Sequence, residues 1–251
     1  MVARQQKRLT KREKRRLKQE GILSDDNRLT SRFNIAKYIQ PMTRNQEIAF
    51  ESWDEGYHLM LHGIAGTGKT FLALYFALRE AMKHSTPYEK VYIVRSTVST
   101  RDQGFLPGSQ KQKEAVYEEV YREVAQELFE RGDAYDILKQ KNLVEFRSTS
   151  FLRGVTFKKC IVVVDEVQNM TDGELHTVMT RIGENARIIF AGDVKQDDLT
   201  SERKKEYSGL RDFMRIIQQM REFDFVEFTA DDIVRSALVK SYILARDRLG
   251  L

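Results

Sequence analysis

The sequence predicts an α/β domain in which a parallel sheet is flanked by helices. A short apolar stretch, residues 58–62, leads into a glycine-rich loop, and a helical pattern over residues 71–84 follows the loop. A second apolar stretch, residues 161–164, consists only of β-branched residues, as is typical of a central strand covered on both faces. Strand patterns and helical patterns then alternate along the chain, and this alternation is typical of parallel sheets.

Length and composition restrict the class of protein. The chain has 251 residues, enough for one such domain, and its 41% hydrophobic and 31% charged residues are typical of a soluble globular protein. No apolar run approaches the roughly 18 residues of a membrane-spanning helix, and no signal peptide is visible. The single cysteine, Cys160, cannot form an intramolecular disulfide. We therefore expect a cytoplasmic protein.

The basic residues are concentrated near the N-terminus. Residues 1–20 contain nine Lys or Arg side chains and two Glu, whereas the remainder of the chain has a small excess of acidic residues. We therefore expect a flexible basic arm over residues 1–32 and a folded domain over residues 33–251. Two roles remain open for the arm: a solubilising tail, or a segment that binds nucleic-acid phosphates with release of counterions.

Apolar stretches and helical periodicity predict the elements of the domain. The expected strands are 58–62, 91–94, 143–146, 161–164, 187–190 and 225–228. The expected helices are 47–53, 71–84, 111–131, 171–182, 208–220 and 230–248. In the helix over 111–131, four apolar residues recur at intervals of four and are expected to form the buried face: Val116, Val120, Val124 and Leu128. The opposite face is expected to be acidic, with Glu118, Glu119, Glu123 and Glu127.

The first strand is followed by a phosphate-binding loop that matches the pattern G-x-x-x-x-G-K-[ST] in its strand–loop–helix setting. The matching residues are Gly63, Ile64, Ala65, Gly66, Thr67, Gly68, Lys69 and Thr70. The glycines let backbone N–H groups surround a polyphosphate, next to the positive end of the helix dipole. Lys69 can reach the β- and γ-phosphates, and the Thr70 hydroxyl can ligate Mg²⁺. The loop therefore predicts a nucleoside triphosphate site.

An acidic pair directly follows the strand over 161–164. Asp165 lies at the strand end that is expected beside the phosphate loop, where it can hold Mg²⁺. Glu166 is expected to face the γ-phosphate and to polarise or deprotonate the attacking water. The pair favours hydrolysis over transfer to a small acceptor.

Further residues resemble motifs of superfamily 1 helicases. The strand over 187–190 leads into Gly-Asp-x-x-Gln, which ends at Gln196, and Asp165-Glu166 continues to Gln168. In that group, the glutamine that corresponds to Gln196 senses the γ-phosphate. Gln46 resembles the glutamine that reads adenine, although a helix-capping or surface glutamine is an equal alternative on the motif alone.

A closer resemblance is to the PhoH family, and it spans roughly residues 41–245. Besides the phosphate loop and the motifs at 165–169 and 192–196, the matching segments are 104–108 (Gly-Phe-Leu-Pro-Gly), 153–157, 180–183, 208–210 and 232–236. The resemblance implies a single RecA-like P-loop ATPase domain that uses ATP and Mg²⁺ and is common in phage genomes. The chain departs from the family at Ser96-Thr97 and at Val167, where no catalytic group is lost. Larger relatives add RNA-binding or nuclease domains, which are not expected here.

The same resemblance implies a nucleic-acid partner, single-stranded RNA or DNA. The loop after the second strand corresponds to a backbone-binding segment of the helicase group and offers Arg95, Ser96, Thr97, Thr100 and Arg101 as donors; Arg153 is a further candidate. A solvated surface loop is the alternative. A different class of function also remains open, that of a nucleotide-gated regulatory or assembly protein with a protein partner.

The final expectation concerns an arginine supplied by a neighbour. Superfamily 1 helicases bind ATP between two RecA-like domains, but only 55 residues follow Gln196 here. We therefore expect a homo-oligomeric ring, which the family resemblance suggests is a hexamer, with Arg235 acting on the site of the next subunit. An apolar stripe is expected to seat the last helix and to leave Arg235 projecting: Ile233, Val234, Ala237 and Leu238. An ion pair with Asp231 or Asp232 is the alternative for this arginine.

Overall fold

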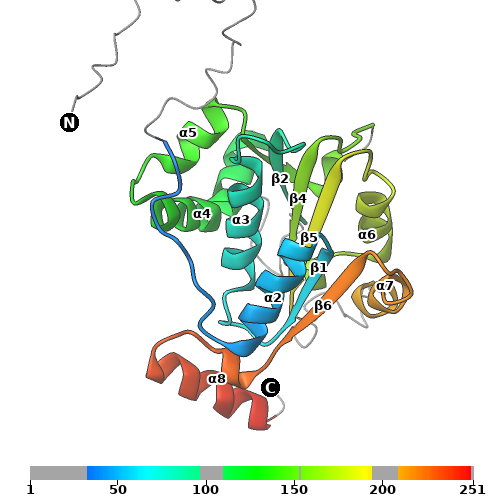
Figure 1. Ribbon diagram of the computed structural model, residues 1–251. Coiled ribbons are helices and arrows are strands. Elements are labelled where there is room, and N and C mark those ends of the chain that lie inside the picture. The colour runs from blue at the N-terminus through cyan, green and yellow to red at the C-terminus, as the bar shows by residue number, and fades with distance from the viewer. Residues whose placement is uncertain (1–32, 97–109, 153, 194–208, 250–251) are drawn as a thin grey trace, which may run out of the picture. The chain divides into compact units, whose positions relative to one another are not determined.

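A computed structural model describes residues 33–96, 110–152, 154–193 and 209–249 of the chain (Figure 1). Residues 35–251 belong to one compact unit, which contains the whole sheet. The basic arm expected over residues 1–32 lies outside the described residues, so the arm and its boundary stay predictions. None of the helices in the described ranges combines the length and apolar character that crossing a membrane requires.

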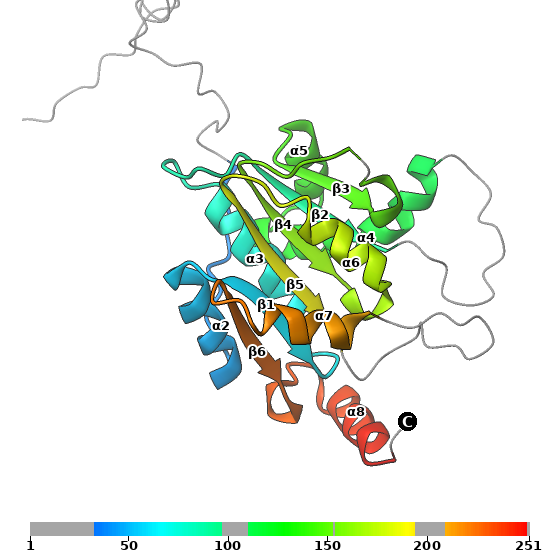
Figure 2. The ribbon, with the colours of Figure 1, turned by 90° about the vertical axis from the view of Figure 1, so that its right-hand side faces the viewer.

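The described residues form a six-stranded parallel sheet, which confirms the predicted fold class (Figures 1 and 2). The strands are β1 (His58–Gly63), β2 (Lys90–Arg95), β3 (Val144–Ser148), β4 (Cys160–Asp165), β5 (Ala186–Gly192) and β6 (Phe223–Phe228). Their order across the sheet is β3-β2-β4-β5-β1-β6. The register pairs Asp165 with both Arg95 and Ala191, so the carboxyl ends of β2, β4 and β5 lie level with one another.

Helices cover both faces of the sheet. They are α2 (Arg44–Glu55), α3 (Lys69–Ala81), α4 (Gln110–Phe129), α5 (Ala134–Gln140), α6 (Asp172–Met179), α7 (Leu210–Ile217) and α8 (Ala237–Leu249). Helices α2, α3 and α4 lie on one face, α6 and α7 lie on the other, and α8 lies beyond the carboxyl ends of the strands (Figures 1 and 2). Short 3₁₀ turns cover 149–151, 167–169 and 230–232.

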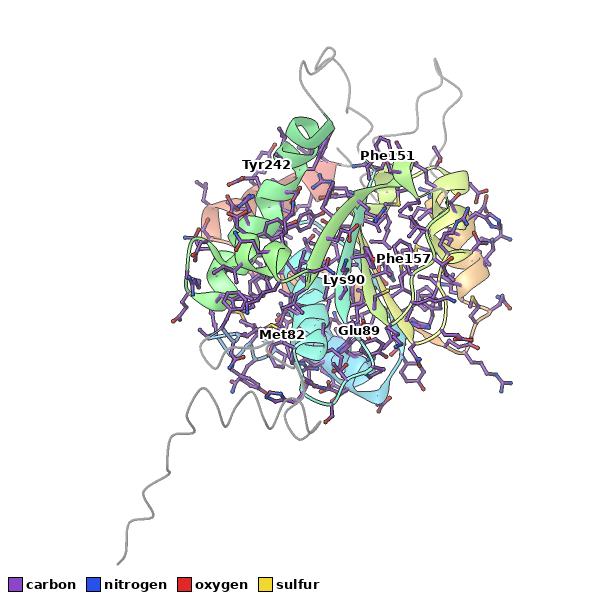
Figure 3. All side chains as sticks on the ribbon, turned by 90° about the horizontal axis from the view of Figure 1, so that it is seen from above. Met82, Glu89, Lys90, Phe151, Phe157 and Tyr242 are labelled. Atoms are coloured by element: carbon purple, nitrogen blue, oxygen red, sulfur yellow. The ribbon has the colours of Figure 1, made fainter. Side chains whose placement is uncertain are left out.

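The core fills both sides of the central strands. Every residue of β4 is buried, as the run of β-branched residues predicts for a strand with helices on both faces. On the α6 and α7 side, Phe190 packs edge-on against Phe213 with ring centroids 4.9 Å apart. On the other side, Trp53 of α2 stacks on Phe76 of α3 at 5.9 Å. In Figure 3, side chains crowd both faces of the sheet, with Phe157 buried and Tyr242 exposed.

Helix α4 buries a different face from the one expected. Val116 is 62% exposed and Val120 is also exposed, whereas Tyr121, Val124, Ala125 and Leu128 are buried. Residues four apart advance by about 40° around a helix, so a stripe at constant intervals of four turns away from the core within three steps. The buried set instead follows the spacing i, i+3, i+4 and i+7, which keeps to one face.

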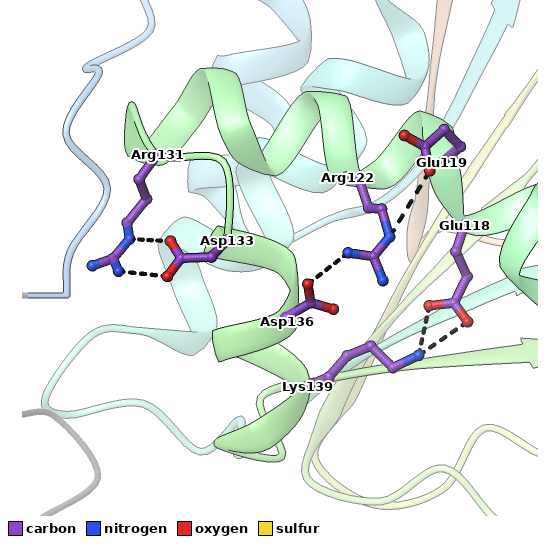
Figure 4. A network of polar contacts seen from close by, with 7 residues as sticks. All are labelled: Glu118, Glu119, Arg122, Arg131, Asp133, Asp136 and Lys139. Atoms are coloured by element: carbon purple, nitrogen blue, oxygen red, sulfur yellow. Dashed lines mark hydrogen bonds and ion pairs between the residues drawn. The ribbon is translucent and has the colours of Figure 1, made fainter.

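The expected acidic face of α4 is also interrupted. Glu118 is buried and pairs with Lys139 of α5, with Nζ 2.6 Å from Oε2 (Figure 4). Arg122 pairs with Asp136 of α5 at 2.8 Å and lies 3.9 Å from Glu119. Two of the expected acidic residues therefore take part in this polar network with α5, which joins the two helices.

The predicted helix over 230–248 is in fact two elements. The Thr229 side chain caps a 3₁₀ turn, Ala230–Asp232, and Ile233 then adopts an extended conformation, so α8 begins only at Ala237. Of the expected apolar stripe, Ile233 is buried, but Leu238 is 80% exposed. The stripe therefore does not seat α8, and Arg235 lies before the helix instead of within it.

Candidate nucleotide-binding site

The phosphate-binding loop joins β1 to α3 and depends on its glycines. Gly63, Gly66 and Gly68 have φ angles of +117°, +78° and +85°, a region that L-residues with a side chain rarely adopt. A Cβ on Gly63 would also collide with the carbonyl oxygen of Phe228 on the neighbouring strand β6. Gly68 directly precedes α3 and provides no side-chain cap, so the N–H groups of the first turn can bind an anion.

Lys69 is folded back onto its own loop. Its Nζ donates hydrogen bonds to the carbonyl oxygens of Gly63 at 2.8 Å and Ile64 at 2.7 Å. Burial lowers the pKa of Lys69, although three nearby carboxylates oppose the shift. A bound polyphosphate would give this buried ammonium a much stronger anionic partner than the two carbonyl groups.

Thr70 and Asp165 meet, as the sequence predicted for a shared Mg²⁺ site. The Thr70 hydroxyl donates to Oδ1 of Asp165 at 2.8 Å. Burial, followed by the neighbouring Glu166, raises the pKa of Asp165 to about 6. Among the described residues no cluster of three or more acidic, His or Cys side chains could form a complete metal cage. One hydroxyl and one carboxylate nevertheless fit Mg²⁺, which is commonly held by one or two carboxylates together with substrate phosphates.

Sequence reasoning missed Tyr121, which contacts the other oxygen of the same carboxylate. Its hydroxyl donates to Oδ2 of Asp165 at 2.9 Å, and the side chain is completely buried. Burial raises the pKa of Tyr121 well above its usual value, so the hydroxyl remains a donor. No local pattern identifies this residue, because it reaches Asp165 from α4 across 44 positions of sequence.

Glu166 is held by Gln168, which the sequence identified only as part of a motif. The Gln168 amide donates to Oε2 of Glu166 at 2.5 Å, and its carbonyl oxygen accepts from the backbone N–H of Asp193 at 3.0 Å. Gln168 thus links the ends of β4 and β5. Glu166 itself has a left-handed backbone, with φ of +54° and ψ of +45°, which is uncommon for a residue other than glycine. Strain of this kind is often found at functional sites.

Gln46 is not a surface residue. It is buried beneath the phosphate loop, and its Oε1 accepts from the backbone N–H of Met42 at 2.8 Å. Its Nε2 lies 3.4 Å from the carbonyl oxygen of Thr67. The surface interpretation is therefore wrong, whereas the reading of adenine stays a prediction.

These residues surround a pocket of about 540 Å³. Its polar lining includes Gln46, Lys69, Thr70, Asp165, Glu166, Gln168, Asp193 and Arg235. Its apolar lining includes Ile39, Met42, Phe71, Leu72, Val120, Val124 and Val234. The pocket thus offers charged and polar groups suited to phosphates and an apolar wall suited to a nucleoside.

Arg235 lies beside the phosphate loop of its own chain and does not project away from it. A Cβ on Gly66 would lie 3.1 Å from Cγ of Arg235 and 3.2 Å from Cδ1 of Ile243. The backbone N–H of Val234 donates to the Gly66 carbonyl oxygen at 3.2 Å. Within the described part of the chain, Arg235 forms no ion pair with Asp231 or Asp232. Asp232 instead accepts hydrogen bonds from Asn45 and the Thr229 backbone, at 2.7 and 2.8 Å.

Only part of the expected nucleic-acid set can be placed. Thr97, Thr100, Arg101 and Arg153 lie outside the described residues, as does the expected sensor Gln196. Ser96 is buried and donates to Glu174 at 3.2 Å, an arrangement that conflicts with a direct phosphate contact from its hydroxyl.

Arg95 is oriented toward the acidic site. Burial alone would lower its pKa, but the combined effect of Tyr121, Asp165 and Glu166 raises it. Its guanidinium also lies over the ring of Tyr117, 5.5 Å from the centroid. Arg95 therefore interacts with the metal-site residues, which differs from the solvent-facing role expected for it.

Comparison with solved structures gives distant similarities. The large terminase of a thermophilic bacteriophage, solved with ADP, aligns over 80% of this chain and 49% of its own, at 12% identity and a TM-score of 0.46. The UvsW helicase of bacteriophage T4 aligns over 78% of this chain and 62% of its own, at 14% identity and a TM-score of 0.44.

Sequence comparison identifies the family. A PhoH-like protein of Synechocystis sp. is 32% identical over 196 residues, which cover 74% of this chain and 55% of that protein. Protein PhoH of Escherichia coli (strain K12) is 33% identical over 178 residues, covering 70% of this chain and 49% of that protein. The chain thus matches about half the length of these relatives. Because the family model described as PhoH-like protein matches residues 38–247, the chain belongs to the PhoH family, as the motifs predicted.

Proposed function

We propose that the protein hydrolyses ATP with the help of Mg²⁺. The observation that carries this proposal is the 2.8 Å hydrogen bond between Thr70, at the end of the phosphate loop, and Asp165, at the end of β4. It brings the two expected metal ligands together at the pocket, beside the buried ammonium of Lys69 and the carboxylate of Glu166. This is the set of groups that phosphoryl transfer to water requires.

Each residue then has a defined task. Lys69 exchanges its two carbonyl partners for the β- and γ-phosphates, and the N–H groups of the loop bind further phosphate oxygens. Thr70 and Asp165 would hold Mg²⁺, which neutralises phosphate charge when bound. Glu166 orients the attacking water and accepts its proton, while Gln168 fixes the direction of the Glu166 carboxylate.

Two substitutions test the assignment. Lys69→Ala should abolish hydrolysis, because it removes the charge that compensates the phosphates. Glu166→Gln should retain bound ATP yet stop turnover, because the metal ligands remain and the base is lost. Phosphate release in a single turnover and binding of a fluorescent ATP analogue measure the two effects separately. Turnover by Glu166→Gln at the parent rate would show that the base is another group.

Coupling to single-stranded RNA or DNA is a further part of the proposal. Arg95, at the end of β2, faces the acidic site, and the next residue, Ser96, donates to Glu174 at the start of α6. A phosphate backbone bound beyond Ser96 would therefore act on a segment already joined to the hydrolytic site. Stimulation of ATP hydrolysis by single-stranded RNA or DNA tests this coupling, and an unchanged rate with both polymers would contradict it.

The alternative, a nucleotide-gated protein with a protein partner, is favoured by the surface of α8. Leu238, Tyr242 and Leu249 lie along one side of this helix and are 80%, 63% and 72% exposed. Such a face normally packs against another element. ATP turnover that is stimulated by a protein partner but not by nucleic acid would support this alternative.

We propose that a second copy of the chain covers α8, because α4 carries a complementary surface. The exposed side of α4 combines Val116 and Val120 with Glu119 and Glu123, at the spacing i, i+3, i+4 and i+7. The exposed side of α8 combines its apolar residues with two basic residues of its last turn, Arg246 and Arg248. Two different surfaces on one chain associate head to tail, and such contacts can close into a ring. Light scattering should give a mass above that of one chain, and Tyr242→Asp should reduce it.

Mixing two inactive variants tests how Arg235 acts. Because Arg235 lines the pocket of its own chain, we propose that it contacts the nucleotide in the same protomer. A mixture of Arg235→Ala and Lys69→Ala protomers should then stay inactive. Restored hydrolysis would instead establish the action across subunits that was expected from the sequence.

A further inference from the structure

We propose that Tyr121 is a positioning residue that orients the Asp165 carboxylate for the Mg²⁺-bound nucleotide. This inference rests on the proposed function, since it concerns the same metal site. It adds a residue from α4, a helix that contributes no expected catalytic group. The role follows from the contacts of the Asp165 carboxylate, from the rigidity of Tyr121, and from its neighbours.

The two oxygens of Asp165 have different donors. Oδ1 accepts from Thr70 at 2.8 Å, and Oδ2 accepts from Tyr121 at 2.9 Å. The terminal torsion of an aspartate is only broadly restricted, so a single hydrogen bond leaves the carboxylate free to rotate. When the Thr70 hydroxyl turns to a metal ion, the Tyr121 bond is the contact that keeps Oδ1 directed toward the phosphate loop.

Tyr121 is rigid enough for this task. It belongs to the buried face of α4, and its ring lies 6.1 Å from the ring of Phe146 on β3. Completely buried side chains in a packed interior keep one rotamer. The hydroxyl therefore occupies a position set by α4 and β3, and it presents that position to Asp165 on β4.

Neighbouring residues of α4 connect this position with the pocket. Val120 and Val124, which flank Tyr121 in the sequence, both line the apolar wall of the pocket. One turn before Tyr121, the ring of Tyr117 carries the guanidinium of Arg95. Contact between a nucleoside and α4 and the orientation of Asp165 thus depend on the same two turns of helix.

The test is the variant Tyr121→Phe, which removes the hydroxyl and keeps the ring. A fluorescent ADP analogue is titrated in EDTA and again at increasing Mg²⁺ concentrations. We expect the affinity in EDTA to stay within about twofold of the parent, because the phosphate loop is unchanged. The gain in affinity produced by Mg²⁺ should fall about tenfold or more, the usual effect of losing a partner of a metal ligand.

The matched control is Tyr135→Phe, which removes a phenol that is equally well buried on α5. It should show the Mg²⁺ response of the parent, and thermal unfolding should verify that both variants fold. The inference is overturned if Tyr121→Phe keeps the full Mg²⁺ response, if it loses affinity equally in EDTA, or if Tyr135→Phe shows the same loss. A parent protein without any Mg²⁺ response would refute the proposed function itself, and the role of Tyr121 with it.

Discussion

Replacing Gln168 by Met should separate ATP hydrolysis from ATP binding. Methionine has a similar length and keeps the site filled, but it removes the donor to Glu166 and the acceptor for the Asp193 N–H group. A hydrogen bond to a charged group contributes about 1.5–3 kcal/mol, and a buried N–H that loses its acceptor costs about 1–3 kcal/mol. We therefore expect the free energy of unfolding to fall by about 2–4 kcal/mol, since the two effects overlap.

The catalytic effect follows from the same contacts. If the bond to Glu166 is worth about 1.5–3 kcal/mol in the transition state, the hydrolytic step should slow by at least about tenfold. Binding of ATP should change little, because Gln168 does not belong to the phosphate loop. Single-turnover phosphate release reports the step, and the fluorescent analogue reports binding.

Gln46→Met provides the matched control. Gln46 is buried to a similar extent and also bonds to backbone groups, but it contacts the phosphate loop and not Glu166. It should weaken nucleotide binding more than it slows hydrolysis of bound ATP, which is the opposite pattern. If Gln168→Met hydrolyses bound ATP at the parent rate, Gln168 does not position the base.

Two further predictions concern pH and the arm. Because burial and Glu166 raise the pKa of Asp165 to about 6, the affinity gained from Mg²⁺ should disappear as the pH falls through 6, when the carboxylate is protonated. In the metal-free protein the raised pKa favours the protonated form, so stability should fall as the pH rises from about 4 through 6; chemical unfolding should show less of this fall in Asp165→Asn, and an equal fall would contradict the assignment. Deleting residues 1–20, with nine basic side chains, should flatten the salt dependence of single-strand binding by up to about 6 in logarithmic slope, at roughly 0.7 per lost phosphate contact. ATP hydrolysis without nucleic acid should not change, and an unaltered salt slope would make the arm a solubilising tail.

The sequence by itself determined the features that depend on neighbouring residues. The phosphate loop is one continuous segment whose glycines, lysine and threonine have their roles because they are adjacent, and the structure has them between β1 and α3. The run of β-branched residues in β4 predicted a central, buried strand for the same reason. Since parallel strands end at one edge of a sheet, the proximity of Asp165 to Thr70 could also be predicted without coordinates.

Only the tertiary structure decided the contacts between segments that are distant along the chain. The bond between Tyr121 and Asp165 and the position of Arg235 against Gly66 depend on how α4 and the segment before α8 pack, and helical periodicity does not specify either. The buried face of α4 was misjudged because a repeat of four drifts around a helix, while the choice among faces is made by α5 and the sheet. A local pattern limits which faces a helix can bury, but packing against particular neighbours selects one of them and so places the side chains of the site.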